Sequence, residues 1–102
     1  MNKRLAVLEK MVNAGGADSF AYYGLALEYR KEGRVEEARQ TFESLKAKDP
    51  DYLPMYLMAG QLLNEANQGE QARGWLETGI ALAQKKGDTK ALGELESELA
   101  KC

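Results

Sequence analysis

The chain has 102 residues, a formal net charge of −2, one cysteine and no histidine. Basic and acidic residues are interspersed along it, so no basic stripe is available to bind nucleic acid. No stretch approaches the ~20 apolar residues that a membrane helix needs. Without histidine the chain lacks the usual general base and the commonest metal ligand. We therefore expect no catalytic, cofactor or metal site, no nucleic-acid or membrane partner, and a cytoplasmic location.

The first predicted helix covers residues 3–13 and ends at Gly15-Gly16. Leu5, Leu8 and Val12 recur at the spacing that places them on one helical face. A helix with a single apolar face must pack on a neighbour. Two roles stay open for this flank: it caps the helices that follow, or it packs on a second copy of the protein.

Residues 19–52 carry two apolar helical faces separated by a break at Gly33. Asp18 or Ser19 is a suitable N-cap for the first helix. Asp49-Pro50 ends the second helix, because the residue before a proline avoids the α conformation. The residues that form these two faces are Tyr22, Leu25, Ala26, Tyr29, Val35, Ala38, Phe42 and Leu45.

Residues 53–86 repeat this pattern with a period of 34 residues, as from Tyr22 to Tyr56. The break now falls at Asn67, which tolerates a left-handed conformation. Asp51 is a suitable N-cap for the first helix, and Pro54 fits its first turn. No proline ends the second helix, so we expect it to continue to about Lys86. The matching pairs include Ala26 with Gly60, Tyr29 with Leu63, Ala38 with Ala72, and Phe42 with Leu76.

The last predicted helix covers residues 89–101 and follows Gly87-Asp88. Leu92, Leu95 and Leu99 lie on one face at helical spacing. We therefore expect an all-α single domain over residues 1–102 with about six helices.

The spacing of Tyr22, Leu25, Ala26, Tyr29, Gly33, Ala38, Phe42 and Pro50 resembles the tetratricopeptide repeat. The second copy departs from the pattern at Ala59, Asn67 and Gln84. The resemblance implies an α-α superhelix of helix-turn-helix repeats with two flanking capping helices. It also implies a protein interaction module that holds its ligand on a concave face.

The resemblance further implies that the first helix of each repeat lines this concave face. The residues left to line it include Phe20, Tyr23, Leu27, Arg30, Leu57, Gln61 and Asn64. Phe20, Tyr23 and Leu27 are unusually apolar for a surface, and three interpretations stay open. The helix 3–13 covers them, they bind an apolar peptide, or they bury in a homodimer.

Some members of this family hold acidic chaperone tails with a clamp of lysine, asparagine and arginine. The matching positions here, Tyr23, Leu27, Met58 and Leu92, carry none of these groups, and Asp88 would repel a carboxylate. We therefore expect an apolar rather than an acidic ligand. The alternative function is a self-associating module that forms a homodimer through its flanking helices.

Trp75 is not required by the repeat, because its counterpart in the first copy is Thr41. Two interpretations stay open: it covers the last helix near Leu92 or Leu95, or it is an exposed binding anchor, a role in which tryptophan is enriched.

Overall fold

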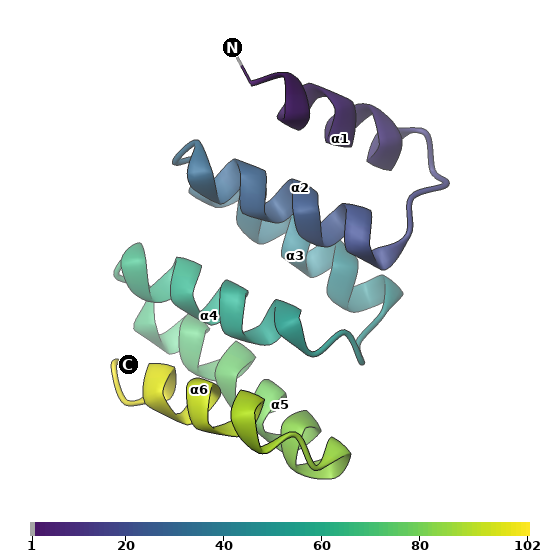
Figure 1. Cartoon of the computed structure of the whole chain (residues 1–102). Helices are drawn as coiled ribbons and strands as arrows, with labels where there is room; N and C mark the ends of the chain where they lie inside the picture. The colour runs from purple at the N-terminus through teal and green to yellow at the C-terminus, as the bar shows by residue number, and fades with distance from the viewer. Residues whose placement is uncertain (1) are drawn as a thin grey trace. The chain divides into compact units, whose positions relative to one another are not determined.

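A computed structural model describes residues 2–102, and these residues form six helices and no strand (Figure 1). They fall into two compact units, which divide after Pro50. Unit 1 contains α1 (Lys3–Asn13), α2 (Ser19–Lys31) and α3 (Val35–Lys48). Unit 2 contains α4 (Pro54–Glu65), α5 (Gly69–Lys86) and α6 (Thr89–Leu99). The all-α prediction with six helices is confirmed, while the predicted extent of a single domain stays a prediction.

Most helix ends lie where the sequence predicted them. The Asp18 carboxylate caps α2 by accepting the backbone N–H of Ala21 at 2.9 Å. Asn67 has a φ of 61°, so the turn between α4 and α5 is left-handed as expected, and α5 continues to Lys86. The N-cap predicted at Asp51 is wrong. The cap residue of α4 is Leu53, which has no capping side-chain oxygen, and Pro54 begins the helix directly.

The core of unit 1 lies between α2 and α3. Ala26 and Ala38 are fully buried, and these small side chains leave room for the equally buried Phe42. The start of α2 and the end of α3 are joined by a hydrogen bond of 2.7 Å, which the Ser19 hydroxyl donates to the Asp49 carboxylate. The small residues of the repeat therefore do what their spacing predicted.

Two glycines of unit 2 lie where helices meet. A Cβ placed on Gly60 of α4 would lie 2.6 Å from Cγ of Leu76, a buried residue of α5. A Cβ on Gly79 of α5 would lie 2.6 Å from Cβ of Tyr56 and 3.0 Å from Cδ2 of Leu95. Gly79 thus contacts both other helices of the unit at once.

Replacing Gly60 with alanine should destabilise unit 2 by about 1–3 kcal/mol, because the added methyl overpacks a core in which Leu76 has no room to move. Gly74→Ala is the matched control, since nothing lies within 4 Å of a Cβ at that exposed position of α5. It should raise stability by about 0.5–1 kcal/mol through helix propensity. Urea unfolding followed by Trp75 fluorescence measures both, and equal effects of the two substitutions would contradict this packing.

In unit 1, α1 packs antiparallel on α2 (Figure 1). The Tyr29 hydroxyl donates a hydrogen bond of 2.5 Å to the Glu9 carboxylate. The pKa of Tyr29 is raised to about 12. Burial is the largest cause of this shift, and the Glu9 carboxylate adds to it. The neutral phenol is therefore favoured by the folded chain.

This pKa shift makes the stability of unit 1 depend on alkaline pH. The contribution of Tyr29 is fully present below its ordinary pKa of 10.0 and is lost as the pH rises toward about 12. The difference in unfolding free energy between the wild type and Tyr29→Phe should therefore shrink across this window. Lysine ionisation affects both proteins equally and cancels. Urea unfolding at a series of pH values measures the difference, and a constant one would refute the linkage.

Candidate functional site

A groove between α4 and α6 is the candidate binding site of unit 2. It encloses about 570 Å³. Leu57 and Gln61, both predicted to line a binding face, lie one turn apart on the α4 side and are half-buried. The residues that α6 contributes are Thr89, Lys90, Gly93, Glu94, Ser97 and Glu98.

The groove exists because α6 packs at a fixed place on α4 and α5. Asp88 caps the start of α6 by accepting the backbone N–H of Ala91 at 3.0 Å. Leu95, which is 1% exposed, then packs against Gly79 of α5. This contact turns the small residues of α6 toward the groove, and no atom lies within 4 Å of a Cβ placed on Gly93. The groove therefore stays open on that side.

Asn64 holds α6 in place through its side chain, and its predicted role in binding a ligand stays a prediction. Its side-chain amide donates a hydrogen bond of 2.8 Å to the Glu98 carboxylate and another of 3.2 Å to the Glu98 carbonyl. Glu98 is only 6% exposed and also forms an ion pair of 3.2 Å with Lys101. The side-chain oxygen Oδ1 of Asn64 accepts a hydrogen bond of 3.4 Å from the Cys102 thiol. These contacts occupy Asn64 within unit 2.

The contribution of α6 to the groove and the burial of Glu98 were not predicted from the sequence. Residues 89–101 were expected only to form a capping helix. The small residues Gly93 and Ser97, one turn apart, were the available signal, since small side chains on one helix face leave space beside it. No local pattern distinguishes the buried Glu98 from the exposed Glu94 and Glu96.

In unit 1 the predicted binding residues lie on α2 and differ in exposure. Phe20 is 69% exposed, whereas Tyr23, Leu27 and Arg30 are half-buried. The interpretation in which the N-terminal helix covers Phe20 is therefore wrong. The side-chain contacts between α1 and α2 lie on a stripe of α2 at least one turn after Phe20.

Gly24 and Glu28 mark that stripe. A Cβ on Gly24 would lie 3.7 Å from the methyl groups of Leu8. The Glu28 carboxylate accepts a hydrogen bond of 3.1 Å from the Asn2 side chain and forms an ion pair of 3.3 Å with Arg4. Phe20 lies in the first turn of α2, one turn before Gly24, and is exposed there.

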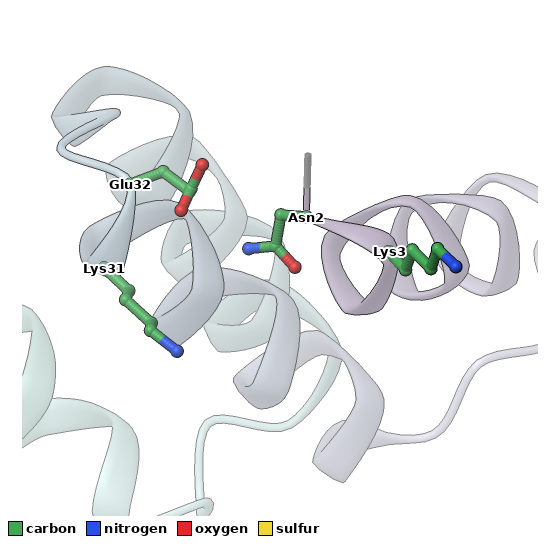
Figure 2. A pocket seen from close by; sticks show the side chains of 4 residues that line it. All are labelled: Asn2, Lys3, Lys31 and Glu32. Atoms are coloured by element: carbon green, nitrogen blue, oxygen red, sulfur yellow. The ribbon is translucent and has the colours of Figure 1, made fainter.

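Unit 1 also has a polar pocket of about 500 Å³ where α1 begins and α2 ends. Asn2, Lys3, Lys31 and Glu32 line it (Figure 2). The Lys3 side chain extends along its own helix, away from Lys31 and Glu32 (Figure 2). The side chains that line the pocket include exposed charges of both signs, and they do not point toward one common position. We therefore assign the pocket no ligand.

Trp75 is only 8% exposed, and its ring centroid lies 6.0 Å from that of Tyr56 at an interplanar angle of 50°. Such a tilted pair is favourable for aromatic rings. The interpretation of Trp75 as an exposed binding anchor is therefore wrong, because its indole belongs to the core.

Ion pairs on α3 are structural rather than part of a site. Arg34 pairs with Glu37 one turn away, and Arg39 pairs with Glu36 through Nε at 3.1 Å. These arginines lower the pKa of both carboxyl groups. Among residues 2–102, no cluster of carboxylate or thiol groups is arranged to hold a metal ion, and no helix has the length and apolar character needed to cross a membrane.

The pairing of antiparallel helices, with small residues where they cross, is consistent with the family that the sequence matches. The model of the tetratricopeptide repeat family matches residues 29–95, which is more than half of the chain. The chain belongs to the tetratricopeptide repeat family. Repeats of this family generally mediate protein–protein interaction.

Solved structures give the same answer. A crystal structure of a tetratricopeptide repeat domain protein from Salinibacter ruber is 33% identical, with a TM-score of 0.75. The match covers 82% of this chain and 94% of that one. A solution structure of a protein from Bordetella parapertussis is 25% identical, has a TM-score of 0.83, and covers 99% of this chain and 88% of that one. Among the curated proteins compared with the chain, none matches.

Replacing Asn64 with alanine should loosen α6 and lower stability by about 1–3 kcal/mol, because the buried Glu98 carboxylate loses a hydrogen-bond donor. Ser97→Ala, at an exposed position of α6, is the control and should change stability by less than about 0.5 kcal/mol. Hydrogen exchange of the α6 amides reports the loosening directly. Unchanged exchange in Asn64→Ala would show that this asparagine does not hold the helix.

Proposed function

We propose that this protein is a cytoplasmic interaction module that binds a peptide segment of another protein in the groove between α4 and α6. The observation that carries the proposal is the groove itself. Its lining combines the apolar side chain of Leu57 with the polar side chains of Gln61 and Ser97. Peptide sites of this kind combine pockets for side chains with donors and acceptors for the backbone.

The charges of the groove favour an apolar ligand over an acidic one. Glu94 and Glu98 lie on its lining, and Lys90 is the one cation among the lining residues. Lys101 already pairs with Glu98 at the edge of unit 2. A carboxylate entering beside Glu94 would meet a like charge in a partly desolvated place, which disfavours its binding.

Gly93→Arg tests the groove because it places a long side chain into the open space beside Leu57 and Gln61. Gly74→Arg is the matched control, since Gly74 is also an exposed helical glycine with no atom within 4 Å of its Cβ, and it lies outside the groove lining. An array of short peptides, each in an apolar form and in a form with added aspartates, serves as the probe.

We expect the apolar forms to bind the wild type and Gly74→Arg equally and Gly93→Arg at least about tenfold more weakly. Fluorescence anisotropy of labelled peptides chosen from the array measures the dissociation constants. Preferential binding of the aspartate forms, equal binding by all three proteins, or no binding in the whole array would count against the proposal.

Self-association is the second candidate, and the exposed apolar side chains of unit 1 favour it. Val7 is 57% exposed, Met11 47% and Phe20 69%. Val7 and Met11 lie one turn apart on α1, and neighbouring exposed apolar side chains of this kind can mark a contact surface. A homodimer that buries them is consistent with this exposure, and light scattering over a range of concentrations distinguishes it from a monomer that binds only peptides.

A further inference from the structure

The outer face of α1 combines apolar and basic side chains. Leu5 is buried on the side that meets α2, while Val7 and Met11, one turn apart, are exposed on the opposite side. Lys3 and Lys10 flank them and are exposed as well. The one carboxylate of this helix, Glu9, accepts the hydrogen bond from Tyr29. The outer face of α1 thus carries two exposed apolar side chains between exposed lysines.

The outer face of α6 has the complementary character. Leu95 is buried against α5, whereas Leu92 and Leu99 are only half-buried. Glu96 lies between them at helical spacing and is exposed. Within unit 2, α6 packs on α4 and α5, and its outer face contacts no other helix of the unit.

The positions of the two helices in the repeat pattern are also complementary. Each complete repeat pairs a first helix with a second, as α2 pairs with α3 and α4 with α5. Helix α6 follows α5 and packs on it as the first helix of a next repeat would. Helix α1 packs on α2 in the position that α5 holds beside α6, which is the position of a second helix. One copy therefore offers a first helix, and another copy offers a second helix.

We propose that the protein associates head to tail, with the α1 face of one copy (Lys3, Val7, Lys10, Met11) packed on the α6 face (Leu92, Glu96, Leu99) of a second copy. Val7 and Met11 then bury against the two leucines, and Glu96 lies among the lysines. This proposal specifies the arrangement of the second candidate function. It does not depend on the groove, which is lined by another side of α6 that includes Gly93, Glu94 and Ser97.

Charge decides between this arrangement and a symmetric one. Two α1 faces packed together would bring Lys3 and Lys10 of one copy against the same lysines of the other, and two α6 faces would oppose their Glu96 side chains. Like charges at a contact are unfavourable, whereas the mixed pairing joins opposite charges. A contact between two different surfaces leaves one of each unused in a dimer, so it can extend to longer assemblies.

Sedimentation velocity over a range of protein concentrations at low salt tests the proposal. We expect concentration-dependent association that Lys10→Glu and Glu96→Lys each weaken by about tenfold, since each turns an attraction into a repulsion. Lys85→Glu and Glu70→Lys, at exposed positions of α5, are the matched controls and should associate like the wild type. Circular dichroism checks that every variant keeps its helices.

Mixing the two weakened variants gives the sharpest outcome. The acidic α1 face of Lys10→Glu matches the basic α6 face of Glu96→Lys, and the unchanged α1 face of Glu96→Lys matches the unchanged α6 face of Lys10→Glu. The mixture should therefore recover an assembly in which the two variants alternate, although each variant alone associates weakly. The double variant should recover the wild-type assembly as well.

A wild type that stays monomeric at all concentrations would overturn both the arrangement and the self-association candidate. Association that Glu96→Lys leaves unchanged, or that stops at a dimer in the wild type, would overturn the arrangement alone. Peptide binding in the groove is measured separately with the Gly93→Arg variant, so the two results remain distinguishable.

Discussion

The structure of unit 2 depends on the close approach of its helices at glycine. At Gly79 the backbone of α5 lies so near Tyr56 and Leu95 that even one methyl group would not fit. Gly60 allows the same closeness between α4 and Leu76. Because these contacts hold α4 and α6 on the same helix, α5, they also position the two helices that form the groove. Core packing and candidate function thus share one cause.

Helix α6 serves two surfaces in different chemical ways. Its side toward α4 is held by Asn64 and the buried Glu98 and borders an open groove with small residues. Its opposite side presents two half-buried leucines around an exposed Glu96. One side of such a helix has its polar groups hydrogen-bonded, and the other side has apolar groups that are only partly covered. A helix of this kind is suited both to binding a ligand and to packing against the next helix of a repeat array. The basic and apolar face of α1 is the counterpart that this chain itself provides.

Each flanking helix meets its neighbour through a specific polar contact beside the apolar ones. Glu9 accepts the hydrogen bond from Tyr29, and Glu98 accepts one from Asn64. These contacts fix the register of α1 and α6, because buried or half-buried carboxylates need their donors. Register in turn decides which side of each flanking helix faces its neighbour.

The sequence alone determined the helices, their turns and their pairing. A period of 34 residues in side-chain size, a left-handed Asn67 and the missing proline near Gln84 are local features, and local conformation and helix periodicity follow from them. The tertiary structure decided the roles of Trp75, Asn64 and Glu98. Asn64 and Glu98 are 34 residues apart in sequence, and their contact depends on how α6 settles on α4. Whether a polar or aromatic side chain is buried or exposed is a property of that packing, which no pattern within one helix contains.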